Sequence, residues 1–130
     1  MRNEPITTSL VASRILARTT AGSTSESTPT AGIDVSGFTK VCVMVNMSAA
    51  TNLTSFYCSP SWSIDNTTFY IPSSLNGATP DLDAVYWGPA TVGKFFKTID
   101  VGGKYMKLYS ALATNGSGTA TYNVDIELIP

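Results

Sequence analysis

The chain has 130 residues, a length typical of one domain built around a single hydrophobic core. Eight basic and nine acidic side chains give a formal net charge of -1 without any histidine, so charge provides no general attraction to nucleic acid or to an anionic membrane surface. Charged residues make up only 13% of the chain, while Ser and Thr make up about a quarter, and this composition favours strands.

Targeting signals are not evident in the sequence. No apolar run approaches the roughly 18 residues that a membrane-spanning helix needs. The opening "MRNEPITTSL" carries charges of both signs and no uninterrupted apolar core, so it is not expected to act as a signal peptide. We therefore expect a soluble chain without a secretory signal.

Residues 1–32 differ from the rest. The stretch "TTAGSTSESTPTAG" is rich in Ser, Thr and Gly and has too few apolar side chains to fold alone. Before it, "LVASRILARTT" favours a strand, because in a helix Arg14 and Arg18 would form a like-charged i, i+4 pair. We expect an extended N-terminal arm and linker over residues 1–32, either frayed or ordered on a neighbouring subunit, followed by a β-sandwich domain over residues 33–130.

Strand signals follow one another at short spacing after residue 32. Apolar and polar residues alternate in "FTKVCVMVNM" and "SFYCSPSW", and turn residues separate these from "TFYIP", "AVYW", "KFFKTIDV" and "KYMKLYSALAT". Seven or eight strands with no long helix indicate an all-β fold, an antiparallel β-sandwich of jelly-roll type.

The last strand, "TATYNVDIEL", has the most regular pattern. Ala120, Tyr122, Val124, Ile126 and Leu128 fall on one face, and polar residues fall on the other. A shift of one residue would expose the whole apolar set, so this pattern fixes the register. The preceding "NGSG" predicts a hairpin turn.

The two cysteines, Cys42 and Cys58, lie on strands expected to be neighbours. If Cys58 shares the core face with the valines of residues 41–45, Cys42 points the other way, which favours free thiols over a disulfide. Without histidine, neither is expected to act as a nucleophile, and no usual zinc site can form. Asp81 and Asp83 do not complete a calcium site. We expect no enzyme activity, no cofactor and no metal.

Lysines and aromatic residues alternate near the end of the chain. With a turn at residues 101–103, one face of a hairpin would collect Lys94, Phe96, Tyr105, Lys107 and Tyr109. Cations between aromatic rings can hold nucleic acid, but the four lysines of this hairpin, Lys94, Lys97, Lys104 and Lys107, are too few in a neutral domain. A solvated face or a protein-binding face is therefore expected.

Six aromatic residues give an alternative of another class: Tyr57, Trp62, Phe69, Tyr70, Tyr86 and Trp87. Trp62 and Trp87 could stack on sugar rings, as in carbohydrate-binding β-sandwiches. The same residue types also fill cores and interfaces, and the sequence leaves these readings open.

Three stretches carry a resemblance to a known group of proteins. They are "GIDVSGFTKVCVMVNMSA", "PSWSIDNTTFY" and "VGGKYMKLYSALATNGSGTATYNVDIEL", and the likeness extends over about residues 33–128. Their pattern resembles small β-sandwich structural proteins of the virions of tailed bacteriophages, although "SSLNGATPDLDAVYWGPA" departs from the compact form.

The resemblance implies a non-enzymatic part of the virion. One position is the capsid surface, as a decoration or cement protein bound in many copies to the major capsid protein, or as a homo-oligomer there; the alternative is an adaptor or fibre base in the neck or tail. No small-molecule substrate, nucleic acid or membrane partner is implied. The expected contact residues are Ile6, Leu10, Val11, Arg14, Ile15 and Arg18 of the arm together with Lys94, Phe96, Tyr105, Lys107 and Tyr109.

Overall fold

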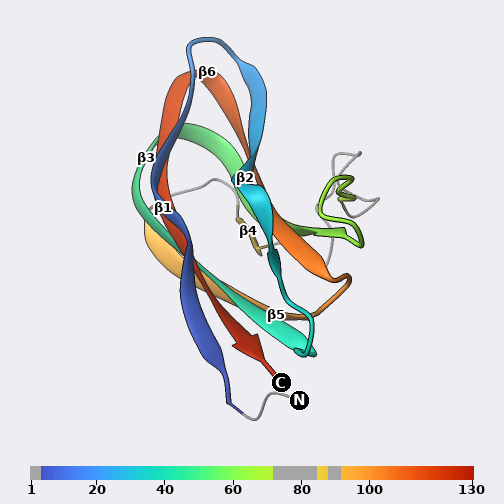
Figure 1. Cartoon of the computed structure of the whole chain (residues 1–130). Helices are drawn as coiled ribbons and strands as arrows, with labels where there is room; N and C mark the ends of the chain where they lie inside the picture. Colours follow the sequence, from blue (N-terminus) through green and yellow to red (C-terminus); the bar gives the residue numbers. More distant parts are fainter. Residues whose placement is uncertain (1–3, 72–84, 88–91) are drawn as a thin grey trace.

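The chain forms an all-β structure in the computed structural model, which describes residues 4–71, 85–87 and 92–130 (Figure 1). The predicted fold class is confirmed: no helix occurs in this part of the chain, and every strand pairing in it is antiparallel. The strands are β1 (Ile6–Arg18), β2 (Gly22–Asp34), β3 (Lys40–Ser63), β4 (Val85–Trp87), β5 (Gly93–Asp100) and β6 (Tyr105–Ile129).

Two very long strands organise the sheet. β3 has 24 residues and β6 has 25, and they pair with each other from Lys40 opposite Ile129 to Ser63 opposite Tyr105. β1 and β2 pair with successive halves of β6, while β5 and β4 pair with successive halves of β3. Each half of the central pair therefore has one further strand on either side.

The sheet folds over upon itself to form two layers, as the arches of β3 and β6 show at the top of Figure 1. Layer A contains β1, β5 and the halves of β3 and β6 at residues 40–51 and 119–129; layer B contains β2, β4 and residues 53–63 and 105–114. The layers face each other, because the ring of Tyr122 in layer A packs edge-on against Phe56 in layer B with centroids 5.0 Å apart. This arrangement is a sandwich made from one continuous sheet.

Bends, and not turns, join the two layers along β3 and β6. Asn52 has φ 54° and Gly116 has φ 147°, and the Asn52 side-chain amide donates to the backbone oxygen of Ser117 over 2.9 Å. The expected hairpin at "NGSG" is therefore wrong, and the two strands expected at "FTKVCVMVNM" and "SFYCSPSW" are parts of one continuous strand. Residues 48–54 and "NGSG" have turn chemistry, but pairing between β3 and β6 resumes beyond them, so each strand continues into the other layer.

The β1–β2 turn lies at the same end of the molecule. Arg18 closes it, since its guanidinium donates to the backbone oxygens of Ser23 at 2.6 Å, Thr20 at 3.2 Å and Ala21 at 3.3 Å. Thr114 of β6 donates to the backbone oxygen of Thr20 over 3.0 Å. Hydrogen bonds therefore connect the β1–β2 turn and the bends of β3 and β6 at one end of the sandwich.

The N-terminal segment differs from the expected arm and linker. "LVASRILARTT" is a strand, as predicted, but the Ser/Thr-rich segment after it is a strand as well, and both pair with β6 of the same chain. Threonine has a high β-propensity, and the edges of β6 supply the hydrogen-bond partners that this segment lacks when considered alone. The low sequence complexity of this segment indicates that it cannot fold alone. It does not exclude the segment from a sheet formed with the rest of the chain.

The core lies between the two layers and follows the predicted alternation. The apolar set of the last strand is buried, and so are Val41, Val43, Val45 and Met47 of β3. Layer B contributes Leu53, Phe56, Cys58, Met106, Leu108 and Leu112 to the same cluster. The confirmed alternation fixes which face of each strand is left for contacts with other molecules.

Candidate functional site

The predicted lysine-aromatic face is divided between the two layers. β5 pairs with β3 in layer A, whereas residues 105–109 belong to β6 in layer B, so residues 101–104 form an arch across the sandwich and not a hairpin turn. Lys94 and Phe96 therefore lie on a different layer from Tyr105, Lys107 and Tyr109. The sequence could not reveal this because a short glycine-containing connection suits a hairpin and an arch equally.

The part of this face in layer B is largely engaged within the chain. Lys107 places its ammonium nitrogen 4.6 Å from the centre of the Phe69 ring, and Tyr109 lies beside Tyr57 with ring centroids 6.2 Å apart. Lys104 lies 5.3 Å from the ring centre of Tyr105. These contacts leave Lys107 and Tyr109 only partly exposed, so we do not include them in the candidate contact surface.

The outer face of layer A is the more open of the two surfaces. Phe96 is 72% exposed, and its neighbour across the strand pair, Met44, is half-buried on the same face. Ile15, opposite Thr121 on the far edge strand, is 68% exposed. A shallow groove of about 390 Å³ runs between Met44, Asn46, Lys94, Phe96, Asn123 and Asp125. We call this surface the layer A face.

The N-terminal candidates have separate locations within β1. Ile15 contributes to the layer A face, Ile6 is 39% exposed near the start of the strand, and Arg18 is committed to the β1–β2 turn. The side chains of Leu10, Val11 and Arg14 lie outside the described part of the structure. Ile15 is exposed, and its expected role as a contact residue stays a prediction. The sequence did not reveal the turn-closing role of Arg18, which depends on β2 folding back.

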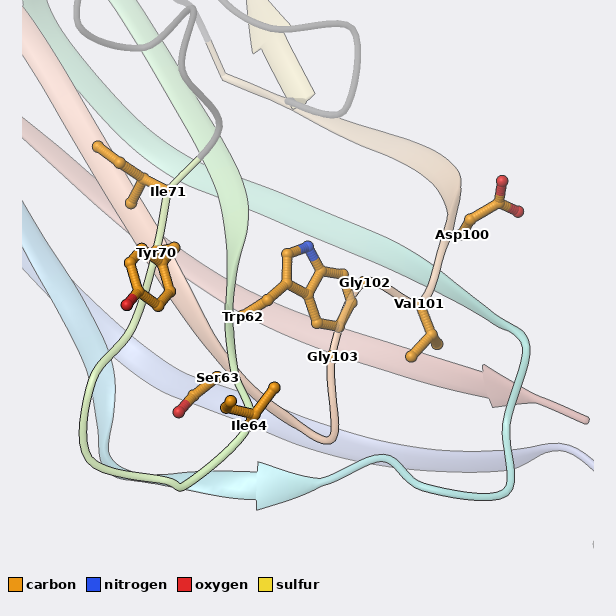
Figure 2. A pocket seen from close by; sticks show the side chains of 9 residues that line it. All are labelled: Trp62, Ser63, Ile64, Tyr70, Ile71, Asp100, Val101, Gly102 and Gly103. Atoms are coloured by element: carbon orange, nitrogen blue, oxygen red, sulfur yellow. The ribbon is translucent and has the colours of Figure 1, made fainter.

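A second groove lies at the end of the sandwich opposite the bends, beside the arch that connects the two layers after β5 (Figure 2). It has a volume of about 450 Å³, and Trp62, Ser63, Ile64, Tyr70, Ile71 and residues 100–103 line it. Trp62 and Tyr70 form an isolated antiparallel bridge, with both backbone hydrogen bonds made at 3.0 and 2.9 Å. We call it the Trp62 groove.

The two tryptophans lie on different strands and at different heights along β3. Trp62 lies near the strand end, whereas Trp87 of β4 pairs with Phe56, six residues earlier on β3. At about 3.3 Å per residue these positions are about 20 Å apart along the strand. The side chain of Trp87 lies outside the described part of the structure. Trp62 instead pairs with Tyr70, another of the aromatic residues noted in the sequence.

The two cysteines have the predicted orientations. Both are free thiols, with Cys58 fully buried and Cys42 half-buried on the opposite side of β3. Desolvation is the main cause that raises the pKa of Cys58 to about 12; the hydrogen bond with Ser110 opposes this, and Glu26 adds to it. A thiol with so high a pKa is a poor nucleophile at neutral pH.

Within residues 4–71, 85–87 and 92–130, no group of three or more Cys, Asp and Glu side chains is placed to hold a metal ion. Asp81 and Asp83 fall outside these residues. No helix among the described residues is long and apolar enough to cross a membrane.

Comparisons with known proteins give a likeness in structure but none in sequence. No protein-family model matches the chain, and no curated protein matches it. A solved chain from Bacillus endospore appendages, described as forming a novel family of disulfide-linked pili, is similar over 94% of this chain and 90% of its own length. The TM-score is 0.43 and the sequence identity 10%, so this likeness carries no argument about the function of the present chain.

Proposed function

We propose that the chain is a non-enzymatic structural component of a tailed-phage virion and that it decorates the capsid by binding the lattice of the major capsid protein in many copies. The sequence pattern of residues 33–128 provides the link to virion proteins. The layer A face provides the means of attachment, and its exposed apolar residues are the observation that carries the proposal.

Adhesion without catalysis requires apolar side chains that become buried on contact. Phe96 and Ile15 expose most of their surface at the two edges of one face, and Val92 beside β5 is 62% exposed. Interfaces are enriched in Phe and Met, and a contact repeated over a lattice gains strength through multivalency. A face that is only moderately apolar suits a protein that folds first as a soluble chain and binds afterwards.

The charged groups of this face favour a mixed partner surface. Lys94 and Asp125 lie along the same groove, and Lys40 pairs with Asp100 over 2.6 Å at the end of β5. Opposite charges at the rim contribute mainly to the rate and orientation of docking. The neck or tail position remains the alternative proposal, and the number of copies per particle distinguishes the two.

Binding of the purified chain to particles that lack it tests the proposal. Phe96→Asp should abolish co-sedimentation with the particles, because it places a charge within the apolar contact. Ile64→Asp is the matched control, since Ile64 is 82% exposed at the Trp62 groove, away from the layer A face, and this variant should bind like the unaltered chain. Equal binding by both variants would contradict docking through the layer A face.

A further inference from the structure

The bend of β6 contains an asparagine-glycine pair that neither the core nor the layer A face uses. Asn115 is exposed, and the residue after it is Gly116. A Cβ built at Gly116 would meet no atom within 4 Å, so the main chain lies in open space there. Because glycine has no side chain to obstruct a close approach, its amide nitrogen is the one that best reaches the side-chain carbon of a preceding asparagine. This pair is therefore a candidate for deamidation.

The main chain of these two residues is unpaired on both sides of β6. Pairing with β2 stops at Thr114, pairing with β1 starts at Gly118, and pairing with β3 is interrupted between Thr114 and Thr119. No described residue therefore pairs with Asn115 or Gly116. Ladder hydrogen bonds hold an amide nitrogen in place, and a segment without them reaches other conformations through small local motions.

Both flanks of this short segment are anchored. The Thr114 hydroxyl donates to the backbone oxygen of Thr20 over 3.0 Å. On the other side, the backbone oxygen of Ser117 accepts from the Asn52 amide over 2.9 Å. A change in the length of the main chain between these two points therefore has to be absorbed within the bend itself.

The other asparagines of the described residues lack this combination. Asn52 and Asn66 use their side chains in hydrogen bonds with the main chain. Asn46 and Asn123 lie opposite each other in the ladder between β3 and β6. Only Asn115, among the described asparagines, precedes a glycine.

We propose that Asn115 deamidates spontaneously in the folded chain and that the isoaspartate formed there loosens the bend of β6. The Gly116 nitrogen forms a bond to Asn115 Cγ, the C–N bond of the side-chain amide breaks, and ammonia leaves with the proton of the Gly116 N–H. Water then opens the five-membered ring. Attack at Cγ gives aspartate, and attack at the main-chain carbonyl carbon gives isoaspartate.

The isoaspartate product changes the main chain as well as the charge. Its chain runs through Cγ, so one methylene group is inserted between the anchored flanks at Thr114 and Ser117. No oxidant, reductant or partner molecule is needed. The modification is therefore independent of attachment to a particle, and either proposal can fail without the other.

Incubation of the purified chain at neutral pH, folded or in guanidinium chloride, tests this site. No Lys or Arg follows Lys107, so trypsin releases residues 108–130 as one peptide that carries Asn115 and Asn123, and mass spectrometry measures its conversion. Asn115 should convert in the folded chain within about threefold of its rate in denaturant, since an unpaired segment opens at almost no free-energy cost. Asn123 should stay unmodified.

Asn115→Gln is the control for the site, because its longer side chain would have to form a six-membered ring, and it should abolish conversion of this peptide. Asn115→Asp is the control for the bend, since it adds the charge without the methylene group. The converted chain, separated by ion exchange, should unfold at a lower temperature than Asn115→Asp. All chains carry Asn76→Gln, because Asn76 also precedes a glycine and lies outside the described residues.

Two results would overturn the proposal. Conversion of Asn115 at least about tenfold slower in the folded chain than in denaturant would show that the fold protects this residue. Equal unfolding temperatures of the converted chain and Asn115→Asp would show that the isoaspartate does not loosen the bend.

Discussion

Cys42 and Cys58 lie on the same strand, but one side chain is buried in the core and the other points away from it. They are separated by an even number of positions, yet the register shifts near Asn52 reverse which face is buried, so Cys58 enters the core and Cys42 points outward. The sequence predicted their opposite orientations from the neighbouring valines and aromatic residues. The continuous strand that joins them could not be predicted, because Asn52 also suits a loop.

Thiol labelling tests these environments. A soluble aromatic disulfide reagent at neutral pH should modify only Cys42 in the folded chain, because Cys58 is buried and its pKa is raised to about 12. In denaturant both thiols should react. Rapid labelling of two thiols in the folded chain, measured by absorbance and mass spectrometry, would contradict the burial of Cys58.

The buried hydroxyl of Tyr122 joins the two layers. The Tyr122 hydroxyl donates to Glu26 Oε1 over 2.8 Å, and desolvation is the main cause that raises the pKa of this tyrosine. Tyr122→Phe should lower the free energy of unfolding by about 1.5 kcal/mol, since a hydrogen bond to a charged group contributes about that much or more.

Chemical denaturation measures this change, with Tyr70→Phe as the control. Tyr70 is 66% exposed and has no side-chain hydrogen bond among the described residues, so its loss of a hydroxyl should change stability by less than about 0.5 kcal/mol. Equal stability of the two variants would show that the bond between layers contributes nothing.

At the scale of the elements, the bends of β3 and β6 determine the architecture. Alternation along residues 119–128 and 41–47 predicted the buried faces correctly, because that pattern is local. Whether a strand ends or bends at "NGSG" depends on its neighbour, since pairing with β3 continues on both sides of the bend. Such nonlocal pairing is not encoded in a short sequence window, so the two-layer division of the lysine-aromatic face was not predictable.

Gly118 tests the close packing at this bend. A Cβ there would lie 2.7 Å from the backbone oxygen of Thr51, which cannot move away as a flexible side chain could. Gly118→Ala should therefore destabilise the fold by about 2 kcal/mol, within the range for overpacking. Ser117→Ala, at an exposed neighbour, should change stability by less than about 0.5 kcal/mol. Thermal unfolding of both variants measures the difference, and similar midpoints would contradict close packing at the bend.

The edge strands contain features that oppose uncontrolled strand addition. Lys97 of β5 lies opposite the buried Val43, which places a charged side chain on the inner face of that edge. Glu26 similarly projects inward from β2, and β1 has two register shifts. Inward charges and bulges are common ways to protect sheet edges. We therefore propose attachment through the layer A face, in place of the strand addition by residues 6–18 that an arm would use.

At the scale of the whole molecule, the layer A face and the Trp62 groove lie on different parts of the sandwich. The layer A face is the outer surface of one layer, and the Trp62 groove lies at the end opposite the bends. A chain attached through the first surface could keep the second open to solvent. The single domain, with its sparse and balanced charge, suits a part that is assembled in many copies.

The central claim is that the chain is a virion shell protein, and quantitative mass spectrometry of purified particles tests it most directly. The chain should be present in a number comparable to that of the major capsid protein subunits. A copy number typical of a single neck or tail ring would contradict capsid decoration and favour the alternative position, and absence from the particles would contradict both.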